Sequence, residues 1–281
     1  MLGKNTKLEK MKDRLTLLLV SYDGYSDMWP TFFKCKEKFW PDCPYPMVLA
    51  NNEKGMDVSN LRVINCGKDA QWSTRTRKAL ESIDTKYVMF LLEDLFISGV
   101  IKTEYIENAL NLMDEDGIDY YKIMTFTKIK TPLYKGINYL HRIPASLSYG
   151  ISLQAAIWEK NHFLEMVGTE DYNPWVFEVE RLEEEQRAED PEKLLGVFDS
   201  RNILNICHMV VQGKYLPGSV KHMEKVGIKV DTTIRKTMSW REDFIYSLKE
   251  RLQPFTERHP RIRETLRAIG PKSVVSKNQK K

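Results

Sequence analysis

The sequence lacks several features that would identify a function directly. It contains neither a G-x-G-x-x-G nor a G-x-x-x-x-G-K-[ST] pattern, so it carries neither a dinucleotide fingerprint nor a P-loop. Its four cysteines form no C-x-x-C pair and have no histidine at zinc spacing. A zinc site is therefore not indicated, and reduced thiols in the cytoplasm are the simplest expectation.

Long hydrophobic runs are also missing. The best candidate, LTLLLV at 15–20, is too short to span a bilayer and lacks a small-residue cleavage site, so we expect neither a transmembrane helix nor a signal peptide. The apolar and charged fractions, 42% and 29%, are those of a globular protein. A chain of 281 residues can bury a large core.

The charge is distributed unevenly along the chain. From Lys214 to the last residue there are 17 Lys and Arg against 7 Asp and Glu, whereas residues 1–213 contain 26 and 32. The composition changes beyond Pro217. We therefore predict a main domain over 1–217 and a basic, partly helical extension over 218–281.

Hydrophobic periodicity predicts alternating strands and helices. Apolar runs bounded by polar residues predict buried strands, and apolar residues three or four apart predict helices. Together they indicate an α/β fold with a single Rossmann-type sheet, mixed but mostly parallel, flanked by helices. The expected strands are 15–20, 44–53, 60–69, 86–99 and 119–124. The expected helices are 27–40, 71–83, 103–117, 154–168, 173–190 and 239–255. We expect short strands, turns or loops over 133–153 and 202–217.

Polar residues follow several of the predicted strands. Ligands of open α/β sheets bind outside the carboxyl ends of the strands, so these residues should lie along one edge. The candidates there are Ser21, Tyr22, Asp23, Asn51, Asp69, Glu93 and Asp94.

Glu93 and Asp94 stand out because they interrupt the apolar run FLLEDLFI at 90–97. A buried carboxylate needs a cation, a set of donors or a proton. Carboxylates at a strand end without a phosphate-binding loop would suit a diphosphate held through a divalent cation. A strand-end cap combined with a structural salt bridge remains an alternative.

The order of several motifs adds a resemblance. SYDGYSDMW, WSTRTRKALESIDTKYVMFLLEDLFISG, YGISLQAAIWEK, NPWVFE and GKY, within residues 14–217, resemble a family of bacterial glycosyltransferases with the GT-A fold that take part in capsule and other surface-polysaccharide synthesis. The resemblance implies transfer of a sugar from a nucleotide-sugar, with a UDP-sugar as first choice, to a glycan or lipid-linked acceptor, with inversion. Family members bind Mn²⁺ or Mg²⁺ through a D-x-D motif, and LEDL departs from that motif.

The resemblance also implies roles for individual residues. Ser21, Tyr22 and Asp23 would contact the nucleoside, and Asp94, helped by Glu93, would bind the metal and diphosphate. Glu178 would be the general base. The remaining candidates are Arg77, with Arg75 as the weaker one, for phosphate, Gln154 and Trp158 for the sugar and acceptor, His208 for the metal, and His208 or Lys214 for the leaving group.

Each role has a structural alternative. Glu178 could be one more solvated acid of a charged helix, His208 a core histidine, Trp158 a core aromatic, and the arginines surface charges. Two other functions also stay open: a sugar-phosphate nucleotidyltransferase, which should carry a glycine-rich loop, and a non-catalytic scaffold.

The basic extension has two interpretations. A cationic amphipathic helix could lie on an anionic membrane, which would place the protein on the inner face of the plasma membrane. It could equally pack on the main domain with a soluble tail. We expect no nucleic-acid partner, because no aromatic-interleaved or helix-turn-helix pattern is present.

Overall fold

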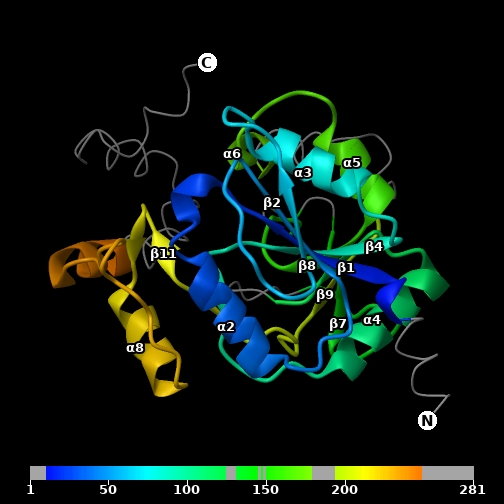
Figure 1. The fold of residues 1–281 in the computed structure, drawn as a ribbon. Coiled ribbons are helices and arrows are strands. Elements are labelled where there is room, and N and C mark those ends of the chain that lie inside the picture. The colour runs from blue at the N-terminus through cyan, green and yellow to red at the C-terminus, as the bar shows by residue number, and fades with distance from the viewer. Residues whose placement is uncertain (1–10, 125–130, 145–146, 148–149, 179–193, 249–281) are drawn as a thin grey trace, which may run out of the picture.

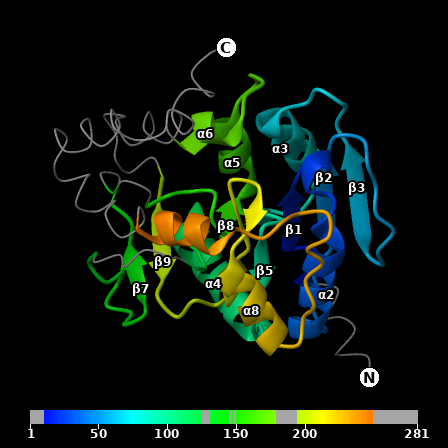
Figure 2. The same ribbon diagram turned by 90° about the vertical axis from the view of Figure 1, so that its left-hand side faces the viewer.

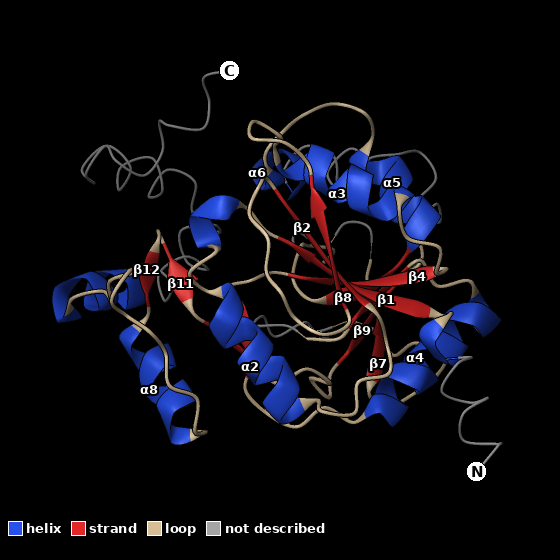
Figure 3. Ribbon diagram, in the orientation of Figure 1, coloured by secondary structure: helices blue, strands red, loops and turns tan. Residues whose placement is uncertain are grey.

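The computed structural model describes residues 11–124, 131–144, 147, 150–178 and 194–248. Within these residues the fold is a large mixed sheet covered by helices on both faces (Figures 1 and 3). The α/β architecture predicted from the periodicity is thereby confirmed.

The sheet has eight strands in the order β3-β2-β1-β4-β8-β6-β9-β7. The first four strands pair in parallel, β8 is antiparallel to both β4 and β6, β6 and β9 are parallel, and β7 is antiparallel to β9. All strands except β8 and β7 therefore end at the same edge. The strands are β1 Leu15–Val20, β2 Met47–Asn51, β3 Leu61–Asn65, β4 Tyr87–Leu91, β6 Tyr120–Lys122, β7 Leu140–Arg142, β8 Ala156–Glu159 and β9 Gly196–Asp199.

Helices pack on the two faces of this sheet (Figure 1). On one face lie α2 Trp29–Phe39 and α4 Thr103–Asp116, and on the other lie α3 Trp72–Glu81 and α5 Lys160–Val167. The shorter elements are η1 Asp23–Tyr25, α6 Pro174–Val176, α8 Pro217–Lys225, and two small antiparallel sheets formed by β5 Leu95–Ile97 with β10 Ile206–His208 and by β11 Val210–Val211 with β12 Lys214–Tyr215.

The central strands are apolar on both sides, because both faces of the sheet are covered. In β1, Leu17 and Leu19 pack under α2, whereas Leu18 and Val20 pack under α3. This alternation follows from the two-residue period of a strand. The two hydrophobic cores therefore share one sheet.

The ends of three helices follow from local sequence. Pro30 lies in the first turn of α2, where its missing N–H is not needed. Gly117 ends α4 in the left-handed conformation, with φ 65°, which a glycine adopts at no steric cost. Asn173 caps α6, since its side chain accepts from the backbone N–H groups of Trp175 and Val176 at 3.0 and 3.4 Å. The remainder of the predicted helix beyond residue 178 lies largely in 179–193, outside the described residues.

The predicted helix over 154–168 is wrong in its first part. Ala156–Glu159 form strand β8 between β4 and β6, and only Lys160–Val167 are helical. The run AAIW is compatible with a helix or with a strand. In the folded protein it forms the strand that pairs with β4 on one side and with β6 on the other. Tertiary pairing therefore overrides the helical period.

The predicted strand over 86–99 is divided. It ends as β4 at Leu91 and resumes as β5 at Leu95, and a turn closed by a hydrogen bond from Leu95 N to the carbonyl of Leu92 lies between. Glu93 and Asp94 occupy this turn. The two acids thus mark the point where the chain leaves the main sheet.

Residues after Pro217 fold back onto the main domain. Met223, Ile228 and Val230 are buried in the core that includes α2, and Met238 is also buried. Arg235 forms an ion pair with Asp27, with 2.8 Å between Nη2 and Oδ1 and side chains 9% and 10% exposed, and its guanidinium lies over the ring of Tyr25. The segment up to residue 238 therefore belongs to the same packed body. No helix of the described residues is both long enough and apolar enough to cross a membrane.

We predict that Arg235→Met destabilises the protein by on the order of 3 kcal/mol, because it leaves the buried carboxylate of Asp27 unpaired. Urea unfolding followed by tryptophan fluorescence measures this change. Lys236→Ala, an exposed neighbour, is the matched control and should change stability little. Equal stabilities of the two variants would show that the ion pair does not hold the segment.

Candidate active site

The carboxyl ends of the strands gather the polar residues. Ser21 and Tyr22 follow β1, Asn51 ends β2, and Glu93 and Asp94 follow β4. Strand β8 starts at the same edge, because Ala156 pairs with Phe90 near the end of β4. The structure thus gathers these predicted residues at one edge of the sheet, as expected for an open α/β fold.

Glu93 is the most strongly perturbed acid of this edge. Its side chain is buried, with the whole residue 7% exposed. Burial, and then the neighbouring Asp94, raise the pKa of Glu93 to about 8, against the opposing effect of Arg75 and a hydrogen bond with Ser21. A carboxyl group that keeps its proton near neutrality ionises readily when a cation arrives.

Arg75, rather than Arg77, faces Glu93. Arg75 is 8% exposed, burial lowers its pKa, and Glu93 and Tyr22 are among its charge partners. Its Nη1 donates to the carbonyl of Ala70, whereas its Nε is buried and has no hydrogen-bond acceptor among the described residues. Arg75 therefore has donor capacity left for an anion.

Arg77 turns to the other side of α3. Its Nη1 donates to the carbonyl of Gly168 at 3.0 Å, and its Nη2 donates to Thr74 Oγ1 at 3.3 Å. Two residues along a helix correspond to about 200° of rotation, so Arg75 and Arg77 face in nearly opposite directions. The expectation that Arg77 faces this edge of the sheet is therefore wrong, and Arg75 is the arginine near Glu93.

Asp94 and His208, both predicted as metal ligands, lie together. His208 belongs to β10, which pairs with β5 and places His208 opposite Leu95. The distance from His208 Nε2 to Asp94 Oδ2 is 3.5 Å, and both side chains are partly exposed. An antiparallel pairing of segments more than 100 residues apart thus assembles this pair.

The pair fits two ligands of one divalent cation. Two donor atoms about 2.1 Å from a cation lie about 3.0 Å apart at the 90° of an octahedral Mg²⁺ or Mn²⁺ site and about 3.4 Å apart at a tetrahedral angle, so the observed 3.5 Å requires a small adjustment. Within the described residues, no group of three or more His, Cys, Asp and Glu side chains forms a cation site. A cation held by Asp94 and His208 would therefore need further oxygen ligands from phosphate or water.

Ser21 and Tyr22 have different environments. Ser21 Oγ is buried, accepts from Trp29 Nε1 at 2.8 Å and contacts Glu93, so it supports the acid. Tyr22 is 44% exposed, and its ring lies against Gly24, where an added Cβ would be 2.4 Å from the ring. Of the two, Tyr22 offers an open aromatic face to a ligand.

Asp23 and Asn51 join the first two strand ends. Asp23 accepts from the backbone N–H groups of Glu53 and Lys54 at 3.1–3.2 Å, and from Asn51 Nδ2 at 3.2 Å. Through these contacts Asp23 connects the loop after β1 with the loop after β2. The Oδ1 of Asn51 is buried with no donor among the described residues, so it is the acceptor that a ligand could satisfy.

Asp69 is exposed on the turn between β3 and α3. The neighbouring turn residues are held by Asn52, whose Nδ2 donates to the carbonyls of Gly67, Lys68 and Ala70 at 3.0 Å each. Asn52 was missed in the sequence. Its position beside Asn51 in the motif ANNE is the signal that could have indicated it.

Gln154 and Trp158 separate in the structure. Gln154 lies at the entrance to β8, and its Oε1 is buried without a donor among the described residues. Trp158 is fully buried, stacked on Phe163 with ring centroids 4.5 Å apart. Since Trp158 lies inside the core, it cannot border an acceptor, and the expectation for it is corrected.

Glu178, which is partly exposed, and the buried Lys122 form a second group of charges. Leu153 N donates to Glu178 Oε1 at 2.9 Å, and burial raises the pKa of Glu178, opposed by the Leu153 N–H and by Lys122. Lys122 ends β6, is 1% exposed, and donates to the carbonyl of Gly150 and to Ser152 Oγ, each at 3.1 Å. Burial lowers the pKa of Lys122 to about 8. Both side chains thus bind the segment that enters β8.

The sequence analysis missed Lys122. The lysine lies in DYYKIM, where it interrupts an apolar run at a strand end in the way that Glu93 and Asp94 interrupt theirs. The same test, a charge inside a buried strand, could have found it. The proposed leaving-group residue Lys214 instead pairs with Glu242.

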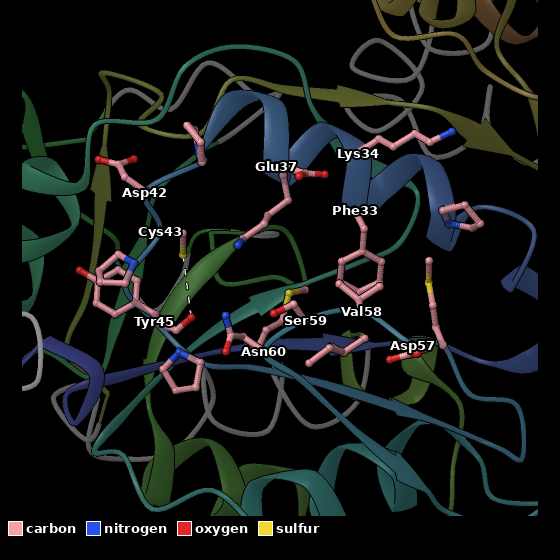
Figure 4. A pocket seen from close by; sticks show the side chains of 18 of the residues that line it. Phe33, Lys34, Glu37, Asp42, Cys43, Tyr45, Asp57, Val58, Ser59 and Asn60 are labelled. Carbon is pink, nitrogen blue, oxygen red and sulfur yellow. Dashed lines mark hydrogen bonds between the residues drawn. The ribbon is translucent and has the colours of Figure 1, made fainter.

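A pocket of about 1000 Å³ lies elsewhere (Figure 4). It is formed between α2, with Phe33, Lys34 and Glu37, and the segments before β2 and β3, and it contains none of the predicted site residues. Met47 and Leu61, which begin their strands, place it toward the amino ends of β2 and β3. It is therefore separate from the candidate site.

Comparisons with known proteins give distant structural similarities. No protein-family model and no curated protein matches this sequence. Residues 1–349 of S. aureus TarS superpose with a TM-score of 0.42 and 13% identity over 66% of this chain and 60% of that one. Another crystal structure of S. aureus TarS superposes with a TM-score of 0.43 and 11% identity over 82% of this chain and 41% of that one. A mycobacterial protein superposes with a TM-score of 0.41 and 13% identity over 68% of each chain. This chain spans less than two thirds of those TarS chains, and we base neither fold nor function on matches at this level.

We predict that the stability of the cation-free protein falls between about pH 5 and pH 8 through Glu93. The unfolded chain releases this proton near the ordinary pKa, whereas the folded protein keeps it to about pH 8, so stability decreases by up to about 1.4 kcal/mol per pH unit. Glu93→Gln removes this dependence, and the exposed Glu81→Gln should retain it. Urea unfolding in EDTA at several pH values gives the comparison, and parallel curves for wild type and Glu93→Gln would contradict it.

We also predict that Lys122→Met raises the pKa of Glu178 further, because a nearby buried cation is lost. Titration of the ¹³C-labelled carboxyl group by NMR, assigned with Glu178→Gln, measures the shift. Lys160→Met is the matched control, since its amine donates to the carbonyl of Ile83 instead. An unchanged pKa in Lys122→Met would show that the two charges are not coupled.

Proposed function

We propose that this protein is a glycosyltransferase that takes its sugar from a nucleotide-sugar donor. The observation that carries the proposal is the convergence, beyond the end of β4, of Asp94 with His208 and of Glu93 with Arg75. Asp94 offers an oxygen ligand and His208 a nitrogen ligand for a cation, and the buried guanidinium of Arg75 suits a phosphate group. Together they suit a diphosphate and its cation. The motif order in the sequence supports the same class.

The donor side of the site would be formed by the strand ends of β1, β2 and β4. Asp94 and His208 would hold a divalent cation, Mn²⁺ or Mg²⁺, which when bound offsets the charge of the departing diphosphate. Arg75 would donate its remaining N–H to a phosphate oxygen. Tyr22 and Asn51 would contact the nucleoside, through a ring face and a free acceptor.

The acceptor side would be formed around the start of β8. Glu178 would accept the proton of the acceptor hydroxyl while that oxygen bonds to the anomeric carbon and the bond to the diphosphate oxygen breaks. The raised pKa of Glu178 suits a base working near neutrality, and Lys122 keeps it from rising further. Attack opposite the leaving group gives inversion, and Gln154 would bind a sugar hydroxyl.

The finer assignment follows the family resemblance. We propose a UDP-sugar as donor and a glycan or lipid-linked glycan of the cell surface as acceptor. UDP and UDP-GlcNAc, which S. aureus TarS binds in its crystal structures, are convenient first probes.

We predict that one nucleoside diphosphate raises the melting temperature in a cation-dependent way. Ligand at a hundred times its Kd adds about 2.7 kcal/mol of stability. Asp94→Asn and His208→Gln should remove the cation-dependent part, whereas Arg75→Met should weaken binding even without a cation. The matched controls are Asp84→Asn and His222→Gln, which alter exposed residues outside the site.

Thermal unfolding with UDP, GDP, CMP and TDP, each with Mn²⁺, Mg²⁺ or EDTA, makes the measurement. If no nucleotide acts under any condition, the proposal fails. Nucleotide-sugar binding without turnover, unaffected by Glu178→Gln, would instead favour a non-catalytic scaffold. Release of pyrophosphate from a nucleoside triphosphate and a sugar phosphate would indicate a nucleotidyltransferase.

A further inference from the structure

The helical residues 240–248 expose a continuous apolar face. Trp240, Phe244, Ile245 and Leu248 are 74%, 64%, 51% and 46% exposed. Their spacing of four, one and three residues places them on one side of the helix. Single exposed apolar residues are common, but a cluster of this kind marks an interaction surface.

The helix is held at its start by contacts that leave this face outward. Ser239 and Glu242 form reciprocal hydrogen bonds, with 2.8 Å from Ser239 N to Glu242 Oε2 and 3.4 Å from Glu242 N to Ser239 Oγ. Glu242 also pairs with Lys214 of β12, and Met238 N donates to the carbonyl of Tyr215. In Figures 1 and 2 the helix, in orange, lies next to α8 and outside the main sheet.

Charges are sorted around the helix. At 100° per residue, Arg241 lies among the apolar side chains, and its guanidinium carbon is 5.1 Å from the centre of the Trp240 ring. Glu242 and Asp243 lie on the other sides. A cation flanked by large apolar groups, with the acids turned away, is the arrangement of helices that lie in a membrane interface.

The sequence that follows carries the same sign of charge. Residues 249–281 contain ten Lys and Arg and three Asp and Glu. A cationic segment joined to an apolar face is attracted to anionic lipid headgroups. A two-fold contact of this face with a second copy is opposed by Arg241, because such a contact would bring the Arg241 side chains of both copies together.

We propose that the face formed by Trp240, Arg241, Phe244, Ile245 and Leu248, which we call the docking face, binds the protein to an anionic phospholipid surface. The apolar side chains enter the headgroup region, and Arg241 contacts lipid phosphates. This surface is independent of the nucleotide site. Its occupancy would bring the carboxyl edge of the sheet near lipid-linked molecules.

Cosedimentation of the full chain with vesicles tests the proposal. The wild type should bind vesicles of phosphatidylcholine with phosphatidylglycerol and should bind pure phosphatidylcholine weakly, with binding reduced by salt. Trp240→Ser combined with Phe244→Ser should lower binding about tenfold or more, since both interfacial anchors are lost. Arg241→Glu should also lower it. Val100→Ser combined with Leu133→Ser removes comparably exposed apolar groups elsewhere and should bind as the wild type does.

Quenching of tryptophan fluorescence by brominated lipids measures contact of the docking face with lipid. It is measured on the wild type, so it does not depend on the folding of a variant. Binding should quench part of the fluorescence, and Trp240→Phe should lose that part. Equal binding by wild type and the serine double variant would overturn the proposal. So would a concentration-dependent dimer that the double variant cannot form, or binding to nucleic acid that depends on the docking face without binding to vesicles.

Discussion

The organisation of the site depends on the cost of burying Glu93. A carboxylate with this little exposure must have a cation nearby or keep its proton, and both conditions shape its surroundings. Arg75 reaches it from the face of α3 that Arg77 does not share, Ser21 contacts it from β1, and Asp94 raises its pKa. The chain turns out of the main sheet at this point, and the second part of the run, β5, then pairs with β10 and brings His208 to Asp94. Glu93 and Asp94 thus lie where β4 ends, and the strand that follows them brings His208 close to Asp94.

The antiparallel strand β8 divides the carboxyl edge into two parts with different chemistry. On the side of β4, Arg75 lies near Glu93 and His208 lies beside Asp94, and these are the groups that we propose for the diphosphate and its cation. On the side of β6, Lys122 and Glu178 bind the backbone and side chains of the segment entering β8. A sugar held between them would have its leaving group on one side and its attacking hydroxyl on the other. The transferase proposal depends on this division of the carboxyl edge.

Much of the fold follows from local patterns, whereas the site depends partly on pairing that no local pattern contains. The buried strand at 15–20, the first-turn prolines of α2 and α6, the cap of α6, and the edge to which the polar residues belong were all predictable from periodicity and turn chemistry. The run AAIW was not, because its apolar residues suit a helix as well as a strand, and only its insertion between β4 and β6 decides the outcome. The choice between Arg75 and Arg77 depended on the rotation of a helix whose two faces both contact protein.

The ion pair between Asp27 and Arg235 joins residues 208 positions apart. Asp27 belongs to the loop after β1, the first strand of the described residues, and Arg235 is one of the later described residues. Domains generally begin to fold from the amino terminus during synthesis, so the sheet can start to form long before this contact exists. The loop that carries Tyr22 and Tyr25 therefore reaches its final form only when synthesis has passed residue 235. A nascent chain shorter than this has the strands of the candidate site without the finished loop after β1.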